Sequence, residues 1–164
     1  MATLAGVLAA AIIGGCTTEH RASSTPLTTT ETTMTMHTIR GEFEVKMLPQ
    51  TDEGVSDAAI GRFALEKQFR GSLDAASKGQ MLGFRSSVKG SAGYVAVERV
   101  VGVLEGKRGS FVLQHDGTMQ GGELHLNIVV VPNSGTEELT GIRGTMKIEI
   151  VEGKHFYVFE YALP

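Results

Sequence analysis

Glu98 and Arg99 are two charged residues in the middle of residues 94–104, the most apolar stretch of the chain. Successive side chains of a β-strand point to opposite faces, so these two cannot pair with each other if the stretch is a strand. Burial of Glu98 in the interior would raise its pKa and make it a candidate acid, base or ligand anchor. We take Glu98 as the candidate catalytic residue and expect Arg99 on the outside. The alternative is that each meets an opposite charge on a neighbouring strand.

Other polar side chains also interrupt apolar stretches, and together with Glu98 they form the candidate ligand-binding set. They are Tyr94, Gln114, His115, Asn127 and Tyr157. Small-molecule sites are typically apolar cavities with a few well-placed polar groups. The sequence has no Gly-x-Ser-x-Gly elbow, Walker motif or phosphate-binding glycine loop, which favours binding over these catalytic classes.

Histidine and cysteine offer little for a metal. The five histidines, at 20, 37, 115, 125 and 155, include no His-x-x-x-His pair, and Cys16 is the single cysteine. A zinc site assembled across strands from His115, His125 and His155 is the alternative to histidines that bond to backbone at strand ends. We predict neither a metal nor a cofactor.

The residues before Cys16 indicate lipidation of this cysteine rather than metal binding. Residues 1–15 carry no charge and are apolar, which is typical of a signal-peptide core too short to span a bilayer. The small residues just before Cys16 resemble the lipobox of bacterial lipoproteins, in which the cysteine is acylated. We expect residues 1–16 to be a lipoprotein signal peptide and the exported protein to be lipid-anchored at Cys16 in the cell envelope. The missing positive charge before the apolar run departs from this pattern, and a short buried helix is the alternative.

The composition divides the rest of the chain in two. Residues 17–36 are rich in Ser and Thr and cannot bury enough apolar surface to offset their ordering entropy, so we predict a disordered tether. Residues 37–164 are expected to form one domain. The net charge of −3 gives no reason to expect a nucleic-acid partner.

Within that domain apolar and polar residues alternate with a period of two, which predicts strands. The expected strands are residues 39–47, 59–69, 73–88, 94–104, 110–115, 124–131, 140–151 and 154–163. Pro49 is expected to end the first strand and Asp116-Gly117 to form a turn. Phe63, Leu65 and Phe69 share one face of the second strand with Lys67.

Short, glycine-rich connections make these strands antiparallel. Eight antiparallel strands avoid free edges by closing into a barrel or by splitting into a sandwich, and we predict an all-β single barrel. Residues 94–104 and 154–163 are apolar on both faces. An apolar outer face favours a homo-oligomer over a covering loop.

Four stretches carry a family resemblance: GSAGYVAVERV at 90–100, GSFVLQH at 109–115, VPNSGT at 131–136 and GKHFY at 153–157. Residues 38–164 resemble the bacterial family catalogued as domain of unknown function 3224. The resemblance implies an eight-stranded barrel with a central cavity, similar to allene oxide cyclase, dirigent proteins and lipocalins. It implies no activity, and the segment 1–36 departs from the shorter members of the family.

Three functions follow for such a protein. The first is a module that binds a small, largely apolar ligand in the barrel lumen. The second is an isomerase or cyclase that acts by confinement, with Glu98 as acid or base. The third is a structural or interaction protein of the cell envelope that assembles through its outer apolar face.

Overall fold

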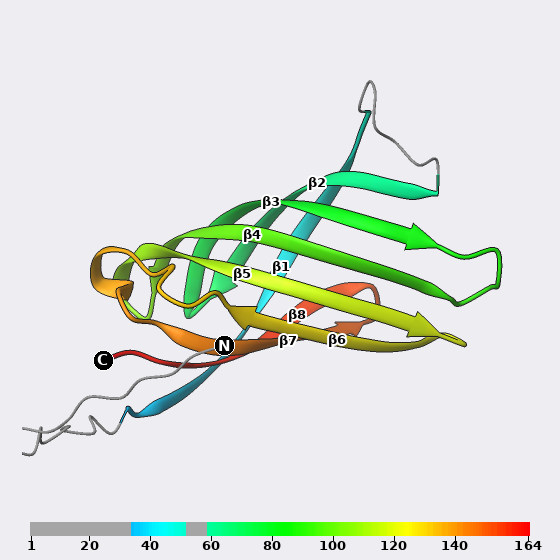
Figure 1. The fold of residues 1–164 in the computed structure, drawn as a ribbon. Helices are drawn as coiled ribbons and strands as arrows, with labels where there is room; N and C mark the ends of the chain where they lie inside the picture. Colours follow the sequence, from blue (N-terminus) through cyan, green and yellow to red (C-terminus); the bar gives the residue numbers. More distant parts are fainter. Residues whose placement is uncertain (1–33, 52–58) are drawn as a thin grey trace, which may run out of the picture. The chain divides into compact units, whose positions relative to one another are not determined.

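The computed structural model describes residues 34–51 and 59–164. These residues form eight strands and one turn of 3-10 helix, η1. The elements are β1 (Met36–Gln50), β2 (Ile60–Gly71), β3 (Leu73–Arg85), β4 (Ala92–Leu104), β5 (Lys107–Gln120), β6 (Glu123–Val130), η1 (Glu137–Leu139), β7 (Arg143–Val151) and β8 (Lys154–Ala162). Each strand pairs antiparallel with the next, and β8 pairs with β1 (Figure 1). The predicted all-β, eight-stranded antiparallel barrel is therefore confirmed.

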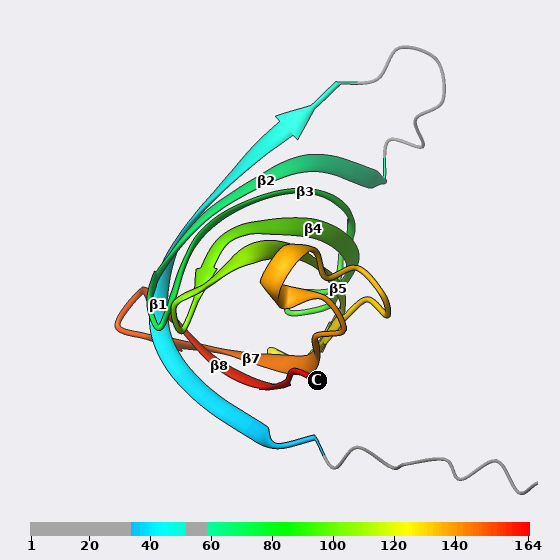
Figure 2. The ribbon, with the colours of Figure 1, turned by 90° about the vertical axis from the view of Figure 1, so that its left-hand side faces the viewer.

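One end of the barrel is filled by an apolar and aromatic core, and η1 lies across this end (Figure 2). Leu139 of η1 and Ile142 after it are each 1% exposed. Beneath them the rings of Phe111 and Phe159 stack at 5.5 Å between centroids, and Phe159 stacks on Tyr161 at 5.2 Å. This closed half supplies the apolar burial that stabilises the fold.

The opposite half of the barrel is only partly closed. β6 and β7 share a single residue pair, Val129 with Thr145. The pairing of β1 with β8 stops at Phe43, so Glu44–Gln50 have β2 as their only neighbour. We call this part the open half. Its inward-facing side chains are partly exposed: Phe63, Met81, Tyr94, Leu126, Met47 and Leu124.

The free edge of β1 explains why Pro49 does not end the strand, as the sequence predicted. Pro49 pairs with Phe63 of β2 inside β1. Proline cannot donate a backbone hydrogen bond, but at an edge strand the missing N–H costs nothing on the unpaired side. The predicted boundary therefore lies three residues too early.

The predicted turn at Asp116-Gly117 is also wrong, because β5 runs through both residues to Gln120. Gly117 lies opposite Tyr94, and a Cβ on Gly117 would lie 2.4 Å from the Tyr94 ring. Gly117 therefore makes room for an aromatic ring within a strand. The turn falls at Gly121-Gly122, where both residues have positive φ.

The outer face of β4 carries valines at the predicted alternate positions. Val95, Val97 and Val101 are each about half exposed, at 53%, 52% and 50%. Arg99 lies among them and donates hydrogen bonds to Ser110 Oγ on β5. The homo-oligomer inferred from this apolar face stays a prediction.

The predicted signal peptide, Cys16 and the tether up to residue 33 lie outside the described residues, whereas Met36 at its end already belongs to β1. Lipid anchoring and an envelope location stay predictions. No helix in residues 34–51 or 59–164 combines the length and the apolar character needed to cross a membrane.

Candidate interior site

Four polar side chains from four consecutive strands meet inside the barrel. They are Lys67 of β2, Ser77 of β3, Glu98 of β4 and His115 of β5, and we call them the buried quartet. Their exposed fractions are 8%, 3%, 1% and 3%. The register explains the meeting, because Lys67 pairs with Ser77, and Glu98 and His115 lie on the inward-facing positions of adjacent strands. The quartet lies between the closed core and the open half.

Glu98 is the centre of the quartet. Its Oε1 accepts a hydrogen bond from Lys67 Nζ at 2.7 Å, and its Oε2 accepts one from Ser77 Oγ at 2.5 Å. Lys67 Nζ also lies 5.3 Å from the centroid of the Phe43 ring. Buried charges are tolerated when they are paired and hydrogen-bonded, and both conditions hold here.

His115 contacts the same carboxylate from the other side. Its Nε2 lies 2.8 Å from Glu98 Oε1, a contact that is an ion pair when the imidazole is protonated. The N–H direction does not give a well-formed hydrogen bond, and Nε2 has no other partner in the described part of the chain. We therefore treat the contact as an electrostatic one that a small rotation of the ring would convert into a hydrogen bond.

The environment of Glu98 sets its ionisation. Burial on its own would raise the pKa, but the contacts with His115 and Lys67 outweigh burial and lower it from 4.5 to about 2. The raised pKa expected from burial is wrong, and the alternative, in which Glu98 meets an opposite charge from another strand, fits the structure because Lys67 bonds to the carboxylate. Glu98 is a permanent anion at neutral pH and cannot serve as a general acid there.

Gly79 creates the space for the Glu98 side chain. Gly79 lies directly opposite Glu98 on β3. A Cβ on Gly79 would lie 2.5 Å from Glu98 Cβ and 2.4 Å from the carbonyl oxygen of Val97. The glycine thus allows the two strands to approach where the carboxylate turns inward.

Tyr94 and Tyr157, both predicted to bind a ligand, lie on the inward face of the barrel but differ in role. Tyr94 is half-buried on the inward face of the open half, and burial followed by the charges of Glu98 and Asp116 raises the pKa of its hydroxyl. Tyr157 is fully buried in the closed half, where its hydroxyl donates to Arg70 O and accepts from Leu73 N. Tyr157 therefore holds backbone together, whereas Tyr94 can meet a ligand.

Gln114 and Asn127, predicted as lumen residues, lie on the outer face. Both are exposed, and Asn127 Nδ2 donates to Asp116 Oδ1 at 2.9 Å. The physical reason is the two-residue period: Gln114 alternates with His115, and Asn127 alternates with buried Ile128. They do not join the quartet.

Lys67 and Ser77 were not among the predicted site residues. The signal for Lys67 was present, because this lysine shares a strand face with three apolar side chains, Phe63, Leu65 and Phe69, that point inward. Ser77 gave no comparable signal, since it lies in a strand of small residues and glycines.

The histidines do not assemble into a metal site. His115 is interior, whereas His125 is 70% exposed and lies opposite Thr118 on the outside. His155 lies beside Phe43, with 5.2 Å between ring centroids. Within the described ranges no three His, Cys, Asp or Glu side chains lie close enough to share a metal ion.

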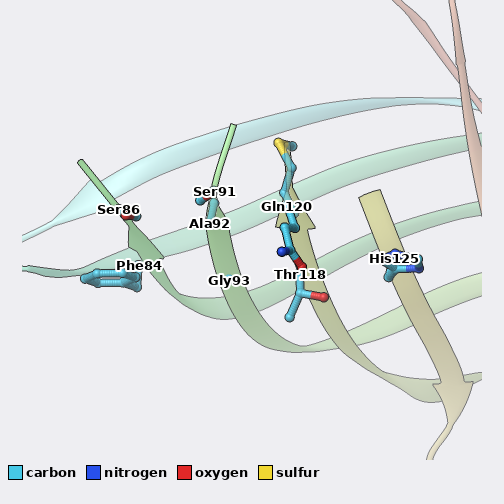
Figure 3. Close-up of a pocket in the computed structure, with 9 residues that line it drawn as sticks. Phe84, Ser86, Ser91, Ala92, Gly93, Thr118, Gln120 and His125 are labelled. Atoms are coloured by element: carbon cyan, nitrogen blue, oxygen red, sulfur yellow. The ribbon is translucent and has the colours of Figure 1, made fainter. Parts of the chain in front are cut away.

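A concave feature lies on the rim of the open half, outside the quartet. It is a shallow groove of about 580 Å³, and its lining is shown in Figure 3: Phe84, Ser86, Ser91, Ala92, Gly93, Thr118, Met119, Gln120 and His125. Most of its side chains belong to the outer face or to turns. The groove contains none of the quartet residues, so the buried charges and the groove are separate features.

The model of the family described as "Protein of unknown function (DUF3224)" matches residues 39–161. The chain belongs to this family. A solved structure of a DUF3224 protein of unknown function from Shewanella oneidensis MR-1 is 49% identical and superposes with a TM-score of 0.74. The match covers 79% of this chain and 99% of that one. Comparison with curated proteins finds no match.

Proposed function

We propose that this DUF3224 protein binds a small, largely apolar molecule in the open half of its barrel, with the polar end of the molecule directed at the buried quartet. The observation that carries the proposal is the quartet itself. An ionised carboxylate, a lysine, a histidine and a serine lie in an interior that is otherwise apolar.

Stability alone is a weak reason for such a cluster. Desolvation of two charges costs several kcal/mol per ion, and apolar side chains of similar volume often give an equally stable or more stable core. Charged groups that persist inside a fold are concentrated at functional sites. The quartet also lies at the base of the partly exposed half rather than in the sealed core.

The wall of the open half combines apolar side chains with a row of glycines. Gly61, Gly83 and Gly117 occupy inward positions in one row across β2, β3 and β5, with Tyr94 between the last two. A Cβ on Gly83 would have its nearest neighbours at 3.8 Å, which is ordinary contact. We infer that a ligand lies along Gly83 and Met81, where a side chain added at Gly83 would compete with it.

Two glycines make a matched test of this location. Gly83 faces the interior, and Gly93 on the adjacent strand faces outward into the rim groove. Neither has a crowded Cβ position or a positive φ. Binding of the neutral fluorophore N-phenyl-1-naphthylamine is measured with the native protein, Gly83→Val and Gly93→Val. We expect fluorescence enhancement with the native protein and Gly93→Val, and a loss of at least about tenfold in affinity with Gly83→Val.

The outcomes distinguish binding in the interior of the open half from binding in the rim groove. Loss of binding in Gly93→Val with retention in Gly83→Val would move the site to the rim groove and overturn the proposal. No enhancement with the native protein, together with no retained small molecule in native mass spectra of protein purified from its host, would also overturn it.

A further inference from the structure

His115 is the member of the quartet that lies nearest to the open half. Counting inward positions along the barrel from Tyr94, the row of Ala96 and His115 comes next, then that of Glu98, and then that of Lys67 and Ser77. Glu98 is therefore beneath His115, and Lys67 is beneath Glu98. The backbone of His115 is thus one row nearer the open half than that of Glu98 and two rows nearer than that of Lys67.

The two nitrogens of His115 have different surroundings. Nε2 faces the Glu98 carboxylate, which can only accept hydrogen bonds, so Nε2 carries hydrogen in both the neutral and the protonated ring. Nδ1 has no hydrogen-bond partner in the described ranges. In those ranges Nε2 is the only fully buried side-chain polar atom without a hydrogen bond, so Nδ1 must reach accessible space.

The rest of the quartet has little capacity left for a ligand. Both Glu98 oxygens are occupied by Lys67, Ser77 and His115. Lys67 Nζ is held by Glu98 and lies against the Phe43 ring. Nδ1 of His115 is the position where a ligand group can bind, and in the neutral ring it is a hydrogen-bond acceptor that can take up a proton.

We propose that the ligand of the open half is a weak organic acid, such as an apolar carboxylic acid or phenol, whose acidic oxygen binds at Nδ1 of His115. The inference rests on the proposed function of the open half. In the complex the proton of the acid lies on Nδ1, the acid is the anion, and no other bond forms or breaks. Glu98 stabilises the resulting imidazolium through Nε2, and Lys67 and Ser77 hold Glu98 in place.

The charges that face His115 agree with this assignment. They are Glu98 from β4, whose Oε1 lies 2.8 Å from Nε2, and Lys67 from β2, which bonds to the same oxygen; Tyr94 of β4 lies one row nearer the open half. On β6 the residue opposite His115 is Ile128, which carries no charge. The ionised carboxylate is thus the group in contact with the ring.

Three eight- to ten-carbon probes test the assignment by calorimetry: octanoate, 4-butylphenol and octan-1-ol. Each is titrated at pH 8 in two buffers of different ionisation enthalpy, so that protons taken up on binding can be counted. We expect octanoate to bind about tenfold more tightly than octan-1-ol and to take up close to one proton. The phenol carries its own proton and is expected to bind with little uptake.

His115→Gln is expected to abolish the proton uptake, and His125→Gln, a change on the exposed outer face, is expected to preserve it. Because His115→Gln alters a buried contact, the native protein supplies a second readout. The ¹⁵N resonance of Nδ1 should shift to the protonated position with octanoate and stay unchanged with octan-1-ol.

Equal binding of octanoate and octan-1-ol without proton uptake would overturn the acid assignment and leave the apolar site standing. No binding by any of the three probes would count against the proposed function itself. Proton uptake that is the same in the native protein and in His115→Gln would place the proton on another group and overturn the role of His115.

Discussion

Glu98 supplies the counter-charge for the buried Lys67. The stability cost of removing this carboxylate can be distinguished from the cost of breaking an exposed salt bridge. Glu98→Gln leaves Lys67, whose side chain is 6% exposed, without a counter-charge. Breaking a buried pair in this way is expected to lower the free energy of unfolding by about 3–5 kcal/mol. Glu66→Gln is the control, because Glu66 on the same sheet is 45% exposed and its contact with Lys78 is 3.8 Å long.

Urea denaturation of the two variants measures the difference. The control should change the free energy of unfolding by less than about 0.5 kcal/mol, since exposed ion pairs contribute little. Equal effects of the two substitutions would mean that the Glu98 contacts are worth no more than surface ones.

The same carboxylate predicts how stability depends on pH. Its pKa is lowered in the folded protein from 4.5 to about 2, so the unfolded chain binds its proton first as the pH falls. The contribution of Glu98 to stability is present in full above about pH 4.5 and is lost progressively toward about pH 2. Linkage gives it a size on the order of 3 kcal/mol.

Unfolding free energies of the native protein and Glu98→Gln, measured between pH 6 and pH 2, check this prediction. The difference between the two curves should shrink as the pH falls through that window. A constant difference would show that the carboxylate titrates normally in the folded state.

At the scale of single strands, β3 shows how glycines on one face can have opposite importance. A Cβ at Gly79 meets Glu98 Cβ and a backbone oxygen within 2.5 Å, whereas a Cβ at Gly83 finds neighbours only at 3.8 Å. Gly79→Ala is expected to lower the free energy of unfolding by about 1–3 kcal/mol through overpacking. Gly83→Ala is expected to be neutral or to stabilise by about 0.4–1 kcal/mol, because alanine restricts the unfolded chain.

Thermal unfolding of both variants decides between packing and strand propensity. If glycine mattered only by weakening a strand, both substitutions would stabilise the protein, and the contact with Glu98 would have no energetic consequence.

The two-residue period predicted the strands well, because every inward position must be apolar or small over much of the barrel. The period could not predict which of the polar residues in apolar stretches come into contact in the folded protein. Glu98 and His115 are inward by alternation, but their contact depends on the register between β4 and β5. Gln114 and Asn127 look equally suitable in sequence and lie outside, since a one-residue shift in register reverses the face.

Strand ends were the least predictable features of the elements. Pro49 and Asp116-Gly117 are ordinary signals for the end of a strand. Tertiary neighbours overrule both, since Pro49 lies on a free edge and Gly117 accommodates the ring of Tyr94. Neither neighbour can be identified from the local sequence.

For the molecule as a whole, barrel closure could be predicted from the number of strands, but the split between its two halves could not. Apolar and polar residues alternate along both β6 and β7. In the described residues these two strands nevertheless share one residue pair, Val129 with Thr145. Where two strands separate depends on the twist of the whole sheet, and this is not encoded in the pattern of either strand.

Hydrogen exchange along β1 tests whether the open half is open in solution. Met36–Arg40 pair with β8 alone, Gly41–Phe43 have a strand on both sides, and Glu44–Gln50 have β2 alone. We expect consecutive amides to be protected only over Gly41–Phe43. From Glu44 onward, only alternate amides should be protected, because those facing away from β2 have no acceptor in the described residues. Exchange monitored residue by residue by NMR should therefore change its pattern at Phe43.

The control is to repeat the hydrogen-exchange measurement over a series of protein concentrations. Uniform protection through Met47 and Leu48 at every concentration would mean that the edge is covered within one molecule and that the barrel is closed along its length. Protection that appears only at high concentration would identify a second copy as the cover, as the predicted homo-oligomer requires. Either result would show that the edge of β1 is covered. A covered edge would leave fewer routes by which a ligand reaches His115, because this edge borders the same half of the barrel.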